Sequence, residues 1–199
     1  MKKKYCFDLD GTITSQEILP IMAAELDLYD EISALTKATI NGLITFEQSF
    51  KLRCRLLSNI PIEKVQEIAD NIKLNKAIVQ FIKKNNDNCC VITGNIYEWI
   101  KPIIEKLDCK VFCSKGKFID NKMISLEKIL NKGDAINELR TKGGTIVSIG
   151  DGMGDVSMFE KSDISIAFGG VHKPIKSLTQ VSNYIVHEEN SLCRLLNTL

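Results

Sequence analysis

The stretch that decides the fold runs from Tyr5 to Thr12 and reads Tyr-Cys-Phe-Asp-Leu-Asp-Gly-Thr. Its first residues predict an apolar strand, which ends in two carboxylates and a glycine turn. Only a methionine and three lysines come before it, and we expect this strand to be the central one of a sheet. The carboxyl end of the strand is then the edge of the sheet at which ligands bind.

The two carboxylates at this edge belong to Asp8 and Asp10. Residues two apart on a strand point the same way, so the two negative charges lie within several ångströms of each other unless the chain bends. Such a pair needs a cation, and hydrated magnesium prefers one or two carboxylates together with phosphate oxygens. The pair therefore predicts a Mg2+ site that presents a phosphoester to one carboxylate. The simpler interpretation is a strand followed by a polar turn.

The composition is that of an ordinary soluble globular protein, with 199 residues, 44% hydrophobic and 26% charged. The net charge of +1 provides no overall field for nucleic acid or an anionic membrane, and we expect neither as a partner. Asp8 and Asp10 interrupt the first apolar run, which argues against a signal peptide, and no stretch is long enough to span a bilayer. The seven cysteines, an odd number, indicate reduced thiols and a cytoplasmic location.

Helical periodicity dominates the sixty residues after Thr12, with apolar positions at helical spacing in 18–26, 30–41, 45–58 and 61–73. Asn41-Gly42 ends one helix, Thr45 with Gln48 caps the next, and Pro61 opens the last. We expect these four helices to pack only on one another. The prediction is a helical cap domain at 14–74, inserted into a catalytic core made of 1–13 and 75–199.

The remainder of the chain alternates between apolar strands and helices. Continuous apolar strands separated by helices predict a parallel sheet covered on both faces, so the fold class is a doubly wound, Rossmann-like α/β sheet with an inserted all-helical cap. We expect turns around Gly116 and at Asp120–Asn121. The predicted strands are 88–94, 110–114, 145–150, 164–168 and 184–186, and the predicted helices are 75–86, 96–107, 131–142, 153–161 and 191–198.

Three predicted strands end in polar side chains that can transfer a phosphoryl group. Asp8 would attack phosphorus and become an aspartyl phosphate. Asp10 would protonate the leaving alkoxide and then deprotonate the water that hydrolyses the intermediate. Asp151 would bind Mg2+ together with Asp8 and the backbone carbonyl of Asp10, while Asp155 supports the water shell of the metal.

Two further groups complete this chemistry at the same edge. Thr93 and the amide of Gly94 would hold a phosphate oxygen, and Lys132 would neutralise the charge shared by the phosphate and Asp8. Taken singly, Thr93 is more often a helix cap and Lys132 a surface lysine. The glycines that follow the strand ending at Gly150 also invite a dinucleotide-binding interpretation, but the carboxylates at 151 and 155 would repel a pyrophosphate there unless a metal intervenes.

These residues carry a resemblance to a known family. The segments Asp8-Leu-Asp-Gly-Thr, Thr93-Gly94, Lys132 and Gly150-Asp-Gly-Met-Gly-Asp155 resemble the four motifs of the haloacid dehalogenase superfamily. Their spacing is similar to that of the phosphoserine phosphatase branch. The segment 42–53 also resembles the Gly-x-x-x-Phe-x-x-Ser-x-x-x-Arg pattern of that branch. The likeness covers essentially the whole chain.

The resemblance implies roles for three residues of the predicted cap. Arg53 would bind the carboxylate of the substrate, Glu17 its amino group, and Phe46 would shield the site from water. The guanidinium suits this role, because it binds a carboxylate in a two-pronged geometry that lysine cannot copy. Two positions differ from the pattern of the branch: Gly154 stands in place of asparagine, and Asn95 replaces a second glycine. Both would line the pocket.

The predicted function is that of a magnesium-dependent phosphomonoester hydrolase acting on phosphoserine or another small phosphorylated metabolite. One alternative is a phosphotransferase that passes the phosphoryl group from Asp8 to an alcohol. Another is a phospho-accepting receiver module, which gives no role to an inserted helical domain or to Asp10 as acid and base. The sequence favours an enzyme over a receiver, and it does not separate hydrolysis from transfer.

Overall fold

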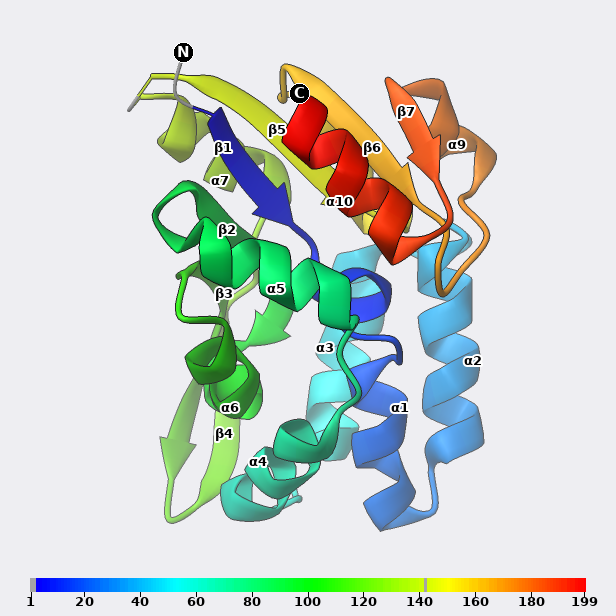
Figure 1. The fold of residues 1–199 in the computed structure, drawn as a ribbon. Helices are drawn as coiled ribbons and strands as arrows, with labels where there is room; N and C mark the ends of the chain where they lie inside the picture. Colours follow the sequence, from blue (N-terminus) through cyan, green and yellow to red (C-terminus); the bar gives the residue numbers. More distant parts are fainter. Residues whose placement is uncertain (1–2, 142) are drawn as a thin grey trace.

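The computed structural model describes residues 3–141 and 143–199, and its centre is a seven-stranded sheet (Figure 1). The strand order is β4-β3-β2-β1-β5-β6-β7, so the first strand is central, as predicted. It pairs in parallel with β2 on one side and β5 on the other. The strands are β1 (Lys3–Phe7), β2 (Cys89–Ile96), β3 (Lys110–Ile119), β4 (Lys122–Lys128), β5 (Thr145–Gly150), β6 (Ile164–Phe168) and β7 (Tyr184–Val186).

The edge strand β4 was not predicted, and it runs antiparallel to β3 while the other neighbouring strands are parallel. The turn expected around Gly116 is wrong, because Gly116 lies inside β3 and pairs with β4. The turn at Asp120–Asn121 is confirmed, with positive φ angles of 45° and 66°. Two consecutive residues of positive φ close a tight hairpin, whereas a single glycine can also occupy a strand.

Helices cover both faces of the sheet, which confirms the doubly wound α/β fold class. The side chains of β1 alternate, since Tyr5 and Phe7 belong to one apolar cluster and Cys6 to the other. The first cluster includes α5 (Lys76–Lys84), α6 (Tyr97–Leu107) and α10 (Glu189–Thr198); the second includes α7 (Lys132–Arg140), α8 (Val156–Phe159) and α9 (Lys176–Gln180). The five-residue α9 was not predicted, and the helix expected at 153–161 is a turn at 153–155 followed by the shorter α8.

The four helices predicted between the first and second strands are present at the carboxyl end of β1 (Figure 1). Thr45 caps α3 by accepting a hydrogen bond from the Gln48 amide at 3.3 Å, and Gly42 ends α2 with a φ of 72°. Pro61 immediately precedes α4 rather than starting it. The helices are α1 (Ile18–Ala23), α2 (Tyr29–Ile40), α3 (Phe46–Leu57) and α4 (Ile62–Asn71).

The expectation that these helices pack only on one another is wrong, because α4 lies against α6 of the sheet. The side-chain amide of Gln66 donates to the backbone carbonyl of Glu98 at 2.8 Å, and the Lys106 ammonium lies 2.8 Å from the Asp70 carboxylate. One apolar cluster runs through both regions. An amphipathic helix gains stability from whichever apolar surface is available, and α6 offers that surface here.

The chain enters and leaves the helical insertion through two adjacent segments. Thr14 forms a β-bridge with Leu74, and the Ser15 amide donates to the Lys73 carbonyl at 2.9 Å. The amide of Asn75 donates to the Ile13 carbonyl, also at 2.9 Å. These contacts lie at the predicted boundaries, and we propose that 14–74 is a cap on a core of 1–13 and 75–199.

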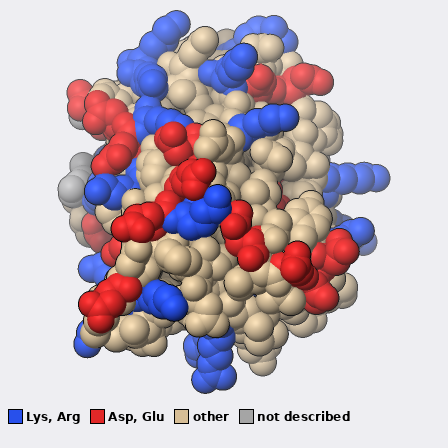
Figure 2. Space-filling view, turned by 90° about the horizontal axis from the view of Figure 1, so that it is seen from below, with Lys and Arg blue, Asp and Glu red and all other residues tan. Residues whose placement is uncertain are grey.

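The surface in Figure 2 carries basic and acidic side chains interspersed over the same face, without a large area of one sign. The exposed ion pairs of the protein include Lys64 with Glu67 at 3.1 Å. Within residues 3–141 and 143–199, no helix combines the length and apolar character needed to cross a membrane.

Candidate active site

The turn after β1 places the first two carboxylates. The strand ends at Phe7, Asp8 follows, and the chain then bends through a single wide turn at Leu9–Ile13 that the Thr14 amide closes on the Leu9 carbonyl at 2.9 Å. Gly11 has a φ of 70°, and a Cβ atom there would lie 2.3 Å from Asp151 Oδ2. Both the conformation and this close approach require glycine.

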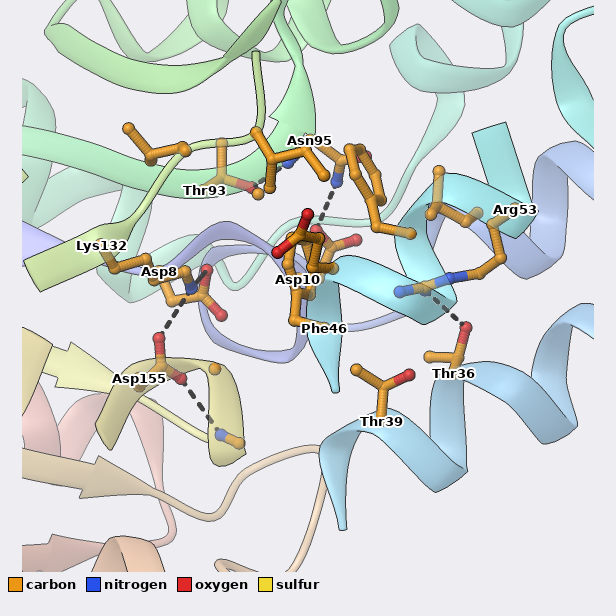
Figure 3. A pocket seen from close by; sticks show the side chains of 18 of the residues that line it. Asp8, Asp10, Thr36, Thr39, Phe46, Arg53, Thr93, Asn95, Lys132 and Asp155 are labelled. Atoms are coloured by element: carbon orange, nitrogen blue, oxygen red, sulfur yellow. Dashed lines mark hydrogen bonds and ion pairs between the residues drawn. The ribbon is translucent and has the colours of Figure 1, made fainter. Parts of the chain in front are cut away.

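A buried lysine links two of the carboxylates. Lys132, the first residue of α7, donates to Asp8 Oδ1 at 2.5 Å and to Asp155 Oδ1 at 2.7 Å (Figure 3). The other oxygen of Asp155 accepts hydrogen bonds from the amides of Asp151 and Gly152 at 3.0 and 3.1 Å. Asp155 therefore fixes both the lysine and the loop that follows β5.

Negative charge exceeds positive charge at this point. Burial, followed by the repulsion of Asp155, raises the pKa of Asp8 well above its ordinary value. Burial and then Asp8 raise the pKa of Asp151 in the same way. Burial by itself lowers the pKa of Lys132, but the attraction of Asp155 and Asp8 outweighs it and raises that pKa. The lysine stays charged and the carboxylates need a further cation.

The donor set fits a hard divalent cation such as Mg2+. Carboxylate oxygens of Asp8, Asp151 and Asp155 lie within 4.8 Å of one another, and all three residues are buried. Asp151 Oδ2 has no hydrogen-bond partner among the described residues, although it is buried. A buried, unpartnered carboxylate oxygen is costly, and a bound cation would remove that cost.

Asp10 is held at both carboxyl oxygens. Oδ1 accepts a hydrogen bond from the Ile18 amide at 3.0 Å, and Oδ2 accepts one from Asn95 Nδ2 at 2.5 Å. Burial, followed by the repulsion of Glu17, raises the pKa of Asp10 to about 7. A carboxyl group with a pKa near neutrality can both donate and accept a proton at physiological pH.

The end of β2 supplies an anion-binding hydroxyl. Thr93 is buried, and its Oγ1 accepts a hydrogen bond from the Asn95 amide at 3.1 Å, which leaves the hydroxyl hydrogen free to donate. Gly94 follows, and a Cβ atom there would lie 2.1 Å from the ring of Phe46. The aromatic ring from α3 therefore lies directly on the backbone of the core.

Arg53 projects from α3 into the same cavity with only 4% of its surface exposed. Its Nη1 donates to Thr36 Oγ1 at 3.1 Å, and its Cζ lies 6.0 and 5.9 Å from the ring centres of Phe46 and Phe50. Burial lowers the pKa of Arg53. Within the part of the chain that the structure describes, no carboxylate forms an ion pair with it, so its remaining donors can bind an anion.

Glu17 has a partner that the sequence did not indicate. His172, from the loop between β6 and α9, places Nε2 at 2.9 Å from Glu17 Oε1 and 4.0 Å from Asp151 Oδ2. A histidine 155 residues away in a loop without periodicity gives no local signal of this contact. If Glu17 binds an ammonium group, its carboxylate does so while it also contacts this imidazole.

A single cavity of about 690 Å³ brings the predicted residues together (Figure 3). All ten predicted site residues line it, and so do Asn95 and Gly154: the ten are Asp8, Asp10, Glu17, Phe46, Arg53, Thr93, Gly94, Lys132, Asp151 and Asp155. No sequence motif indicated Thr36 and Thr39 of α2, or the segment from Leu126 to Asn131, which begins inside the unpredicted strand β4. The missed residues lack a motif, because only the packing of α2 on α3 and the path of β4 bring them here.

Comparison with characterised proteins agrees with this geometry. The chain is 29% identical over 180 residues to the phosphoserine phosphatase of Methanocaldococcus jannaschii, covering 84% of this chain and 85% of that enzyme. It is 28% identical to the phosphoserine phosphatase of Archaeoglobus fulgidus, of which the match spans 52%.

Two solved structures are similar over nearly their whole length. One is a phospho-aspartyl intermediate analogue of phosphoserine phosphatase, with a TM-score of 0.85, 26% identity, and coverage of 98% of this chain and 99% of that one. The other is a substrate-bound phosphoserine phosphatase complex, with a TM-score of 0.86, 25% identity, and coverage of 100% and 99%. The predicted α/β fold and the predicted phosphatase class are confirmed.

The family model of haloacid dehalogenase-like hydrolases matches residues 6–160. This range includes the turn after β1, the end of β2, Lys132 and the loop after β5. Since the match covers well over half of the 199 residues and contains all the carboxylates of the site, the chain belongs to the haloacid dehalogenase-like hydrolase family.

Proposed function

We propose that this protein is a magnesium-dependent phosphomonoesterase that acts through an aspartyl phosphate on phosphoserine or a closely related small phosphorylated metabolite. The observation that carries the substrate proposal is the buried Arg53, which forms no ion pair with a described residue and lines the same cavity as Asp8 and Lys132. A substrate with a phosphate at one end and a carboxylate at the other would supply an anion to each of these cationic groups.

The chain's own residues account for the transfer. Asp8 attacks phosphorus as the bond to the leaving oxygen breaks, and Asp10 gives that oxygen a proton. Water then attacks the aspartyl phosphate while Asp10 takes its proton. Thr93 donates its free hydroxyl hydrogen to a phosphate oxygen together with the Gly94 amide, and Lys132 offsets charge at Asp8.

The metal would be held by Asp8, Asp151 and the backbone carbonyl of Asp10, with Asp155 supporting its water shell. When bound, Mg2+ supplies positive charge that offsets the negative charges of the phosphate and the carboxylates. The buried, unpartnered Asp151 Oδ2 supports this assignment, and so does the crowding of three carboxylates around one lysine.

Three residues contributed by the helical insertion would select the substrate. Arg53 would bind the carboxylate, Glu17 the ammonium group, and Phe46 would exclude water above Gly94. Gly154 leaves open space in the wall, since a Cβ atom there meets nothing within 4 Å. This extra room is the reason that the proposal includes relatives of phosphoserine.

Phosphate release from a panel of monoesters tests the function. The panel contains phosphoserine, its analogue without the amino group, sugar phosphates and nucleotides, each with Mg2+ and with a chelator. We expect phosphoserine to have the highest specificity constant and the chelator to abolish turnover. Full activity without divalent metal, or equal activity on all members of the panel, would overturn the metal assignment or the substrate assignment respectively.

The phosphotransferase alternative is tested in the same assay with an alcohol such as glycerol added. Hydrolysis predicts that phosphate release equals substrate consumption at every alcohol concentration. A deficit of phosphate matched by a new phosphoester would identify transfer instead.

We also propose a cytoplasmic location, supported by the free thiols of all seven cysteines.

A further inference from the structure

Asn95 contacts two of the groups that carry out the proposed reaction. It follows Thr93 and Gly94 at the end of β2 and is 4% exposed. Its backbone amide donates to Thr93 Oγ1 at 3.1 Å, and its side-chain Nδ2 donates to Asp10 Oδ2 at 2.5 Å (Figure 3). One residue therefore connects the phosphate-binding hydroxyl to the acid and base.

The second contact fixes the plane of the Asp10 carboxyl group. The Ile18 amide holds Oδ1 at 3.0 Å, so the two oxygens are bound by donors from opposite sides of the chain, one in the cap and one in the core. A carboxyl group held at one oxygen can still rotate about its last torsion angle, while one held at both cannot. Asn95 is the side chain that completes this restraint.

The side-chain oxygen of Asn95 indicates that a gain in fold stability is not the reason for an asparagine at this position. Asn95 Oδ1 is buried and has no hydrogen-bond partner among the described residues. Buried acceptors are normally satisfied, and a small apolar residue would avoid the loss. Turning the amide over would place Oδ1 against Asp10 Oδ2, where it would repel the ionised carboxylate that the second step requires. The contact with Asp10 thus fixes the orientation of a side chain that is otherwise unfavourable here.

We propose that Asn95 is a positioning residue that holds the Asp10 carboxyl group in line for proton transfer; this inference rests on the proposed function. In the first step a bond forms between an Asp8 oxygen and phosphorus, the bond to the leaving oxygen breaks, and the proton moves from Asp10 to that oxygen. In the second step Asp10 takes a proton from water, the water oxygen bonds to phosphorus, and the bond to Asp8 breaks.

The two steps depend on Asp10 differently for different leaving groups. An alkoxide such as that of phosphoserine is a strong base and needs a proton to leave, whereas 4-nitrophenolate is a weak base and does not. Both substrates need Asp10 in the second step, because both form the same aspartyl phosphate. Loss of positioning should therefore slow both steps for phosphoserine and only the second step for 4-nitrophenyl phosphate.

The test compares Asn95→Ala with wild type on these two substrates. We expect kcat for phosphoserine to fall by about 10- to 100-fold with KM nearly unchanged. For 4-nitrophenyl phosphate we expect a rapid burst of nitrophenolate that approaches one equivalent per enzyme, followed by slow turnover. Asp10→Asn should show the same pattern with a larger loss of kcat. That loss is the upper limit for the effect of Asn95→Ala.

Two further variants make the result specific. Asn75→Ala removes another side-chain amide near the same turn, one that donates to the Thr12 carbonyl at 2.7 Å and does not contact Asp10, and it should give no burst. Asn95→Leu nearly keeps the volume and removes the donor without adding charge, and it should behave like Asn95→Ala. It decides the question if the alanine variant melts below the assay temperature.

Equal losses on both substrates without a burst, or a loss carried by KM, would show that Asn95 is merely structural and would overturn the proposal. An unchanged kcat for phosphoserine would do the same. A wild-type protein that hydrolyses no monoester in the presence of Mg2+ would overturn the proposed function first and this inference with it. The wild-type measurement thus separates the two failures.

Discussion

The two walls of the cavity differ in how their charged groups are paired. On the core side, Asp8, Asp151 and Asp155 crowd together, and Lys132 is the lysine that contacts two of them. On the cap side, the guanidinium of Arg53 lies near aromatic rings and the hydroxyl of Thr36, with no ion pair among the described residues. The core wall carries an excess of carboxylates, and the cap wall carries, beside Glu17, a guanidinium that can bind an anion.

This difference explains how one cavity can separate chemistry from selection. The core carboxylates repel one another and raise each other's pKa, and in the proposed function they would bind a metal and react at phosphorus. The buried guanidinium of Arg53 forms no ion pair with a described residue, and a ligand anion could bind to it. A substrate with one phosphate and one carboxylate would satisfy both walls at once, while a simple phosphate would satisfy only the first.

The largest effect should come from the core wall. Asp8→Asn keeps the shape of the side chain but removes the nucleophile and weakens the metal site, so we expect turnover below roughly a ten-thousandth of wild type. Single-turnover assays with saturating Mg2+ measure this, and a thermal melt checks that the variant is folded. Wild-type turnover would remove Asp8 from the mechanism.

Arg53→Ala should lower kcat/KM for substrates that carry a carboxylate and leave kcat/KM nearly unchanged for substrates that lack one. Loss of a buried, charge-assisted contact to a carboxylate should lower kcat/KM for phosphoserine by about 10- to 1,000-fold. The value for 4-nitrophenyl phosphate, which has no carboxylate, should change by less than about 3-fold on the same reasoning. Losses of equal size on both substrates would mean that Arg53 supports the cavity wall and does not read the substrate.

The metal-free protein should lose stability as pH rises. The folded pKa of Asp10 is about 7, above its usual value of ~3.9, so its protonated form is favoured in the fold. Its contribution to stability is complete below pH ~4 and is lost as pH rises towards about 7. The melting temperature of Asp10→Asn in chelator should therefore fall less over this range than that of wild type.

Bound Mg2+ should oppose the loss of stability that the metal-free protein shows as pH rises. Mg2+ binds the folded carboxylates, and protons compete with it for them, so stabilisation should be greater at pH 7 than at pH 5. Thermal melts with and without Mg2+ at the two pH values measure the difference. A metal effect that does not depend on pH would contradict a site made of these carboxylates.

The smallest effects come from two glycines four residues apart, Gly150 at the end of β5 and Gly154 in the loop that follows. A Cβ atom at Gly150 would lie 2.4 Å from Asp155 Cγ, so Gly150→Ala should destabilise the fold by about 1–3 kcal/mol. A Cβ atom at Gly154 meets nothing within 4 Å, so Gly154→Ala should stay within about 0.5 kcal/mol of wild type. Urea unfolding compares the two, and equal values would mean that the loop after β5 is free to move.

Sequence alone determined much of the core because its signals are local. The central strand, the four helices after it, and the cap at Thr45 each follow from a few neighbouring residues. The carboxyl ends of parallel strands meet at one edge, and this rule alone predicted that Asp8, Thr93 and Asp151 would line one cavity.

Tertiary structure decided the contacts between segments far apart in the chain. His172 meets Glu17, Asn95 meets Asp10, and α4 lies against α6, and no periodicity or spacing marks these pairs. The same is true of β4, which becomes a strand only because β3 offers an edge to pair with. Side-chain types and local dihedral preferences are written in the sequence, whereas the partner that satisfies each polar or apolar group is settled only when distant segments pack together.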